Sequence, residues 1–520
     1  MRKTITIAAL FGLLSLVSCG RTQDPTPAVP PVPKYAVAGQ ITSQPCVYKQ
    51  KDEEFAARCG FIYVPENRSK PDSRLIALPY QRILAQTKHP AEPLFALNGG
   101  PGQSNMRFSF PMPVFVGERD IVLVGYRDID GTVQLVCPDV DALLKRGGAL
   151  LGAAAIADMG EAYRQCAARH TKAGVDLAGY SVLEVADDLD AVRHALGYER
   201  IDLYSISYGT RLALIYGWRY PERVFRSAML NVNPPGRFWF DPVLLDRQLR
   251  RYAALCASDT YCASRTMDLA ADMKRALAKM PKRWLGFPVS RDVALLGTFM
   301  ALYSTDGAAA TFDMWIAAAN GDYSGMALVT ATYTMMLPSE MYSGDYAAKG
   351  FSADFDPSKD YASELVPGRT LIGSPLNVVA AAGVKAWPEH KVPTEYRMAR
   401  RSDVETIMLS GTLDVADPAE NAGNQLLPLM PNAKQVTLAE FSHAGDLLNC
   451  QPDATQRLLT TFYRTGRADA SGFHYRPVNF DPGWMSFPLI AKALLGAALL
   501  IAGAAAGLLV WLFRRRRKVR

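Results

Sequence analysis

The chain has 520 residues, of which 49% are hydrophobic and 21% charged, so it can bury a sizeable core in one large domain with an insertion or in two domains. The formal net charge of +7 does not indicate nucleic-acid binding. Eight of the 57 basic residues lie in the first three and last seven positions, and the other 49 balance the 50 acidic residues.

The first 39 residues are predicted to precede the folded part. Residues 1–19 carry Arg2 and Lys3, then an apolar run and small residues, which is typical of an export signal. Residues 16–19, LVSC, resemble the lipobox of bacterial lipoproteins, which implies a lipid on Cys19; an ordinary signal peptide cut nearby is the alternative. Residues 20–39 are rich in proline and are predicted to form a linker.

Eight cysteines in an exported chain favour disulfides, because the compartment is oxidising. The plausible pairs are Cys46 with Cys59, Cys137 with Cys166, and Cys256 with Cys262, which leaves Cys450 free. Sequence alone cannot fix the connectivity. Zinc ligation is the weaker interpretation, since neither CxxC spacing nor a histidine partner accompanies them. We predict no metal and no cofactor.

Short apolar runs alternate with helical patterns on both sides of a long helical segment. The runs begin at residues 73, 93, 120, 201, 224, 405 and 433, and residues 182–197 have the apolar spacing of a helix. Alternation of this kind predicts an α/β fold, with a mostly parallel sheet covered on both faces, over residues 40–237 and 394–480. Residues 238–393 are predicted to be helical, as an inserted lid or as a separate domain; the lid is favoured because strand patterns resume at Glu405.

Ser207 lies between a predicted strand and a predicted helix. A sharp strand-to-helix turn exposes a serine hydroxyl at the carboxyl edge of a parallel sheet, and it requires small residues two positions before and after the serine. Ser205 and Gly209 meet this requirement. The pattern therefore predicts a catalytic nucleophile, with a buried serine at a helix cap as the alternative.

A serine hydroxyl needs a histidine base to become nucleophilic. In folds of this kind the chain order is serine, acid, histidine, which excludes His89, His170 and His194, because all three precede Ser207. His443 follows the strand pattern that begins at residue 433 and is the predicted base. His390 and His474 are weaker candidates.

The predicted acid is Asp414, because it follows the strand pattern at 405–411 as His443 follows the next one. Asp417 is the rival carboxylate. Its position before Pro418 is typical of a helix N-cap, which favours a structural role.

The glycine-rich stretch LNGGPGQS, residues 97–104, follows an early strand pattern. Its glycines let backbone amides point into a site, and we predict that the amides of Gly100 and Tyr208 form an oxyanion hole. Taken alone, the stretch could also be a tight structural turn.

Residues 493–513 carry no charge and are long enough as a helix to cross a hydrocarbon layer of roughly 30 Å. We predict a membrane helix within 487–513. The tail RRRRKVR, 514–520, would then stay in the cytoplasm, so that the bulk of the chain faces outward from the inner membrane of a bacterial cell envelope. Removal of the helix by a sorting protease is the alternative.

Four motifs together resemble α/β-hydrolases of the proline iminopeptidase and tripeptidyl aminopeptidase group. They are NGGPGQS, SISYG, LSGTLDVADPAENA and FSHAG, and the likeness runs from about residue 58 to 464. The resemblance implies an α/β-hydrolase fold with a helical lid, Ser207 as nucleophile, Asp414 as acid and His443 as base, and cleavage near the amino terminus of a peptide. Asn98 stands where the group usually has histidine, and Ser205 where it has glycine.

Aminopeptidases of this group bind the substrate amine through acidic residues in or beside the lid. Glu340 and Glu364 are candidates, with solvated surface charges as the alternative. We therefore expect a membrane-anchored serine hydrolase that acts as an aminopeptidase on small peptides, with no nucleic-acid partner. A carboxylesterase or lipase-like enzyme with the same triad, or an inactive peptide-binding ectodomain, are the other possibilities.

Overall fold

A computed structural model describes residues 29–50, 52–106, 112–337, 342–356, 358–365, 370–381, 383, 386–388, 390 and 392–518. The predicted export signal, the lipidation candidate Cys19 and Glu340 lie outside the described residues.

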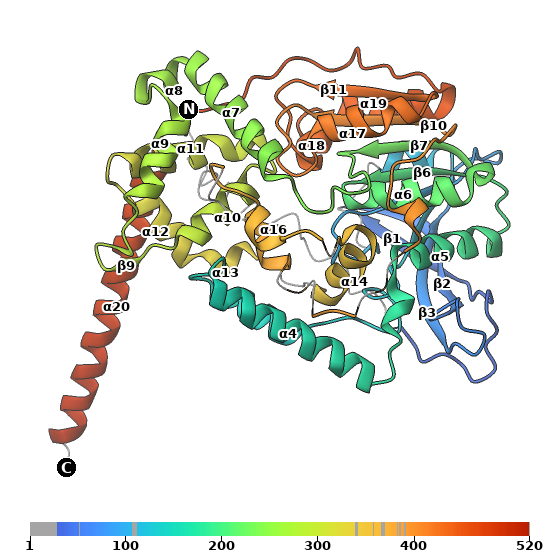
Figure 1. The fold of residues 1–520 in the computed structure, drawn as a ribbon, viewed down its shortest axis with the longest axis horizontal. Helices are drawn as coiled ribbons and strands as arrows, with labels where there is room; N and C mark the ends of the chain where they lie inside the picture. The colour runs from blue at the N-terminus through green and yellow to red at the C-terminus, as the bar shows by residue number, and fades with distance from the viewer. Residues whose placement is uncertain are drawn as a thin grey trace.

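The core is a nine-stranded sheet in the order β1-β2-β3-β5-β4-β6-β7-β10-β11 (Figure 1). Pairing is antiparallel from β1 to β5 and parallel from β5 to β11. The strands are β1 (Gln44–Gln50), β2 (Glu53–Pro65), β3 (Leu75–Ile83), β4 (Leu94–Leu97), β5 (Ile121–Val124), β6 (Ile201–Ile206), β7 (Val224–Leu230), β10 (Glu405–Gly411) and β11 (Ala433–Leu438). The predicted mostly parallel sheet is confirmed.

The edge strand β1 and its neighbour β2 were not predicted. Buried and exposed residues alternate in the second half of β1 and the first residues of β2, so no continuous apolar run marks these segments. The Cys46–Cys59 disulfide joins the two strands.

Helices cover both faces of the sheet. Neighbouring residues of one strand enter different apolar clusters: Leu203 packs in a cluster with α5 (Val182–Ala195) and α6 (Tyr208–Arg219), whereas Tyr204 packs in a second cluster with α19 (Pro452–Thr465). The helix predicted over 182–197 is therefore present as α5, and its predicted apolar face is buried. This strand order, with helices on both faces, is the α/β-hydrolase fold.

Five further helices of the described chain lie outside the segment 238–393 and before residue 487. They are α2 (Met112–Val116), α3 (Pro138–Arg146), α4 (Ala153–Lys172), α17 (Ala419–Gln425) and α18 (Ala444–Asn449).

Residues 238–393, here called the helical insertion, leave the sheet after β7 and return before β10. These two strands pair directly, with Leu230 opposite Leu409. The helices of the insertion are α7 (Pro242–Ser258), α8 (Thr260–Arg265), α9 (Leu269–Ala278), α10 (Arg291–Ala301), α11 (Ala308–Ala319), α12 (Ser324–Ala331), α13 (Tyr333–Met336), α14 (Ser343–Asp354), α15 (Tyr361–Leu365) and α16 (Pro375–Ala381). A two-stranded hairpin, β8 (Arg283–Trp284) with β9 (Phe287–Pro288), interrupts them. The insertion thus enters between neighbouring strands, as a lid would; its role as a lid stays a prediction.

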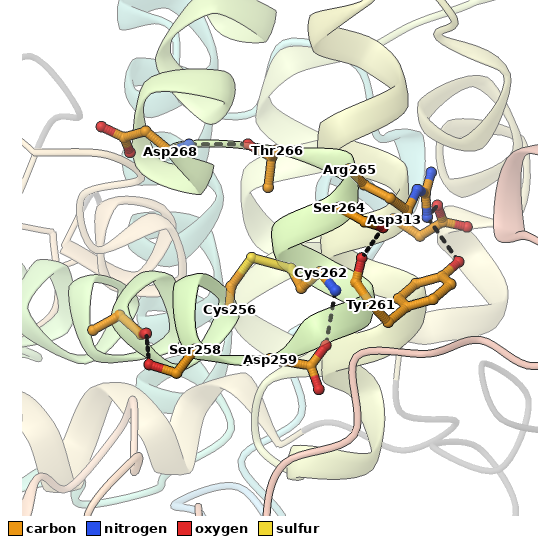
Figure 2. The surroundings of a disulfide bond; sticks show 11 residues. Cys256, Ser258, Asp259, Tyr261, Cys262, Ser264, Arg265, Thr266, Asp268 and Asp313 are labelled. Carbon is orange, nitrogen blue, oxygen red and sulfur yellow. Dashed lines mark hydrogen bonds and ion pairs between the residues drawn. A yellow bond between two sulfur atoms is a disulfide. The ribbon is translucent and has the colours of Figure 1, made fainter.

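The three predicted disulfides are confirmed, and Cys450 is free among the seven described cysteines. Figure 2 shows the smallest loop, in which Cys256 at the end of α7 is bonded to Cys262 on α8. Asp259 lies between them and accepts a hydrogen bond of 2.8 Å from the Cys262 amide, so the disulfide and the helix cap fix the same turn.

The C-terminal helix α20 (Phe487–Lys518) projects away from the rest of the molecule (Figure 1). Its apolar part, Phe487–Leu512, contains an 18-residue window with a mean hydropathy of 2.4 and is long enough to cross a membrane. The first turns dock on the helical insertion, where Lys492 pairs with Asp322 at 2.7 Å and the Phe487 amide donates to Asp313.

Candidate active site

Ser207 occupies the turn between β6 and α6. Its backbone has φ 53°, in the left-handed region that costs a non-glycine residue strain. A Cβ on Gly209 would lie 2.3 Å from the Leu97 carbonyl oxygen, so only glycine fits at that position. Ser207 stands at the N-cap position of α6, but its side chain makes no cap hydrogen bond. The hydroxyl is therefore available for a role other than capping.

His443 and Asp414 are in direct contact. Asp414 lies on the loop after β10 and His443 on the loop after β11, and Nδ1 of His443 is 3.0 Å from each carboxylate oxygen of Asp414. The carboxylate also accepts hydrogen bonds from Asn231 Nδ2 at 2.6 Å and from the amides of Ala416 and Asp417 at 2.9 and 3.0 Å. These donors hold the carboxylate against the imidazole ring.

This pair sets the protonation of both groups. Burial alone would lower the pKa of His443, but the charge of Asp414 and its hydrogen bond raise that pKa above its ordinary value. Burial would likewise raise the pKa of Asp414, yet His443 and the two backbone amides bring it below its ordinary value. Asp414 is thus a carboxylate that stabilises the imidazolium form of His443.

The hydroxyl of Ser207 donates to Asp417, at 3.2 Å from Oδ2. Within the described residues it makes no hydrogen bond to His443. The interpretation of Asp417 as a helix cap is wrong: Pro418 is at the N-cap of α17, and no side chain caps that helix. The local pattern misled because the loop curls around Asp414, which accepts the Asp417 amide and so turns the Asp417 side chain toward Ser207.

Asp417 is fully buried in this site. Its Oδ1 accepts from Asn233 Nδ2 at 2.7 Å. Burial raises the pKa of Asp417 to about 6, the charge of His443 opposes this, and the nearby charge of Asp414 adds to it. The site therefore holds two carboxyl groups beside one histidine.

The glycine-rich loop faces the same turn. A Cβ on Gly99 would lie 3.1 Å from the Ser207 Cβ, so the loop backbone reaches the serine only because no side chain intervenes. The Gly99 amide is occupied by Asn98 Oδ1 at 2.8 Å. Among the described residues, the amides of Gly100 and Tyr208 have no hydrogen-bond acceptor, as the prediction of an oxyanion hole requires.

Residues of the helical insertion contact both sides of this candidate site. The Tyr303 carbonyl accepts the His443 amide at 3.1 Å, and the two rings meet edge to face with centroids 4.8 Å apart. On α14, Asp345 accepts the Gly102 amide at 2.5 Å. Buried Lys349 pairs with both Asp345 and Asp128. The insertion thus contacts both the loop after β11, which carries His443, and the glycine-rich loop.

Several of these residues were missed at the level of sequence. Asn231 and Asn233 follow β7, and their position at the carboxyl edge of the sheet could have marked them. Tyr303 and Asp345 belong to the insertion, where no motif indicates which residues turn inward.

Glu364, a sequence candidate for amine binding, is exposed on α15. It borders a cavity of about 470 Å³ lined also by Arg237, Trp239 and Lys359. The described lining of this cavity includes neither Ser207 nor His443. Cys137, Cys166 and His170 lie close enough together to suggest a metal site, but the two sulfurs form a disulfide.

Comparison with known proteins identifies serine peptidases as relatives. The serine protease Hip1 of Mycobacterium tuberculosis is 28% identical over 429 residues, which cover 70% of this chain and 77% of that protein. The tripeptidyl aminopeptidase of Streptomyces lividans is 29% identical over 203 residues, 35% of this chain and 37% of that enzyme. The matched part is thus little more than a third of the tripeptidyl aminopeptidase. No family model matches.

Solved structures with a partial likeness include an esterase from Exiguobacterium antarcticum. It is 11% identical, with a TM-score of 0.37, and the alignment covers 78% of this chain and 99% of that one. An esterase from Thermogutta terrifontis is 13% identical, with a TM-score of 0.34, over 78% of this chain and 98% of that one. The strand order, and not these scores, defines the fold. The predicted resemblance to the α/β-hydrolase serine peptidases is confirmed.

Proposed function

We propose that the protein is an exported serine hydrolase, anchored in a membrane, that releases residues or short peptides from the amino termini of peptides through an acyl-enzyme. The observation that supports this most strongly is the contact of His443 with Asp414, on loops that flank the strained turn of Ser207. The similarity to serine peptidases favours peptides over other acyl compounds as substrates.

In the proposed reaction, the Ser207 hydroxyl turns from Asp417 to Nε2 of His443 and gives up its proton as Oγ bonds to the scissile carbonyl carbon. The amides of Gly100 and Tyr208 donate to the oxyanion that forms. The imidazolium then protonates the leaving amine as the carbon–nitrogen bond breaks. Water then gives a proton to His443 as its oxygen bonds to the acyl carbon, the bond from that carbon to Oγ breaks, and the imidazolium returns the proton to Ser207.

The proposed setting is the inner membrane of a bacterial envelope. The apolar helix α20 would cross the membrane, and its arginine-rich end would remain in the cytoplasm with the catalytic domain on the outer side. A lipid on Cys19 would attach the amino terminus to the same outer surface.

The test is the turnover of chromogenic amides by the full-length protein in detergent. Aminoacyl and tripeptidyl p-nitroanilides are compared with short-chain p-nitrophenyl esters, with Ser207→Ala as the blank. We expect cleavage of at least one amide class above the blank. Turnover of esters alone would identify an esterase, and no turnover with any substrate would argue for an inactive ectodomain.

A further inference from the structure

The proposed mechanism leaves one buried acid in the site without a task. Asp417 lies against the nucleophile, with Oδ2 at 3.2 Å from Ser207 Oγ and Oδ1 at 2.7 Å from Asn233 Nδ2. Its backbone amide donates to Asp414 at 3.0 Å, so the backbone that carries this side chain is held by the proposed catalytic acid. The arrangement is built into the same loop as the triad.

A carboxylate at this position opposes the proposed chemistry unless something balances it. It accepts the hydrogen bond that Ser207 must give to His443, and it adds negative charge beside the oxyanion. Within the described residues, the hydrogen-bonding partners of Asp417 are a serine and an asparagine, and no lysine or arginine forms an ion pair with it. A buried charge of this kind is stable only beside a cation, and otherwise the carboxylate binds a proton.

The missing charge can come from the substrate. In a peptide, the α-nitrogen of the first residue lies about 2.5 Å from that residue's carbonyl carbon, from standard bond lengths and angles. At attack, that carbon lies about 3 Å from the serine oxygen. An α-ammonium on the scissile residue can therefore reach hydrogen-bonding distance of an oxygen that itself lies 3.2 Å from Ser207 Oγ.

We infer that Asp417 binds the α-ammonium of the substrate residue whose carbonyl Ser207 attacks, so that the enzyme removes single residues from unblocked amino termini. The inference rests on the proposed function and names its substrate class. Binding of the ammonium draws Asp417 away from the hydroxyl, which becomes free to donate to His443. Each additional residue before the scissile bond would move the amine by about 3.3–3.6 Å, so a tripeptidyl amine lies beyond the reach of Asp417.

The experiment measures kcat/KM of the full-length protein for three matched substrates. They are alanine p-nitroanilide, its N-acetyl derivative, and the lactic acid analogue in which a hydroxyl replaces the amine. Because a hydrogen-bonded ion pair in a buried site is worth a factor of ten or more, we expect wild-type protein to prefer the free amine by at least about tenfold over both neutral substrates. The comparison needs no variant and so does not depend on refolding a changed protein.

The variant Asp417→Asn then tests whether Asp417 is the residue that causes the preference for the free amine. The amide is isosteric and can still accept from Asn233 and donate to Ser207 Oγ. We expect it to abolish the preference for the free amine. Labelling of Ser207 by a fluorophosphonate reports that the variant is folded. Glu222→Gln makes the same chemical change at an exposed surface pair and should leave the preference intact.

Three results would overturn the inference. In the first, wild-type protein cleaves the free and acetylated amides with equal kcat/KM. In the second, Asp417→Asn lowers kcat/KM for both substrates by the same factor. In the third, Glu364→Gln and not Asp417→Asn abolishes the preference for the free amine. In each case labelling of Ser207 persists and the proposed serine-hydrolase chemistry stands. If wild-type protein neither labels nor cleaves any amide, the proposed function fails and the inference fails with it.

Discussion

Replacement of Asp414 by asparagine tests the catalytic acid most sharply. Both carboxylate oxygens lie 3.0 Å from His443 Nδ1, so Nδ1 carries the hydrogen and Nε2 is free to accept a proton from Ser207. An amide nitrogen facing Nδ1 favours the opposite tautomer, in which Nε2 carries the hydrogen. We expect kcat to fall by about 10⁴-fold, or about 5 kcal/mol in the barrier, with little change in KM.

The pH profile gives an independent readout of the same contact. A histidine base acts only when it is neutral, so activity rises as the pH increases through the pKa of His443. That pKa lies above its ordinary value because of Asp414, despite burial. In Asp414→Asn the pKa of His443 falls, and the acidic limb of kcat/KM moves to lower pH.

The assay is kcat/KM for a chromogenic substrate between pH 5 and 9, with the rate of fluorophosphonate labelling measured in parallel. Glu222→Gln serves as the surface control. If Asp414→Asn keeps a tenth or more of the labelling rate, or if Asp417→Asn lowers labelling more than Asp414→Asn does, the assignment of Asp414 as the acid is refuted.

Three further predictions follow from the packing. Gly209→Ala places a methyl group 2.3 Å from a backbone carbonyl oxygen, so it should abolish labelling and lower the free energy of unfolding by about 1–3 kcal/mol. Gly217→Ala on the same helix has its nearest neighbour at 3.8 Å and should be tolerated. Equal effects of the two variants would contradict this prediction. Asp345→Asn removes the charge that links the insertion to the glycine-rich loop, so it should lower kcat by about 10-fold or more, without effect on α20. An unchanged kcat would show that contacts other than Asp345 hold this loop in place. Alanine at both Cys256 and Cys262 removes a disulfide that closes a short loop, so the free energy of unfolding in a denaturant titration should fall by about 2 kcal/mol. The value of kcat should be unchanged.

The strained turn at Ser207 could be predicted because its requirements are local. A strand, a serine between small residues and a helix all lie within one short stretch, and the small residue Gly209 is needed to avoid the backbone of β4. Asp414 and His443 could be placed because parallel strands end at the same edge of a sheet. Their contact required only that β10 and β11 be neighbours, as they are.

Asp417 could not be placed in the same way. Its sequence neighbours favour a helix cap, and only the curl of the loop around Asp414 turns its side chain toward Ser207. The contributions of Tyr303 and Asp345 depend on how the helices of the insertion pack over the sheet. No local pattern encodes that packing, since the partners are more than 100 residues apart in the chain.

Fluorophosphonate labelling of the full-length protein, followed by mapping of the modified residue, tests whether Ser207 is a nucleophile activated by His443 and Asp414. We predict a single adduct on Ser207, absent in Ser207→Ala and formed at least about a thousandfold more slowly in His443→Ala. An adduct at another residue, or labelling of Ser207 that is indifferent to the loss of His443, would contradict the proposed mechanism.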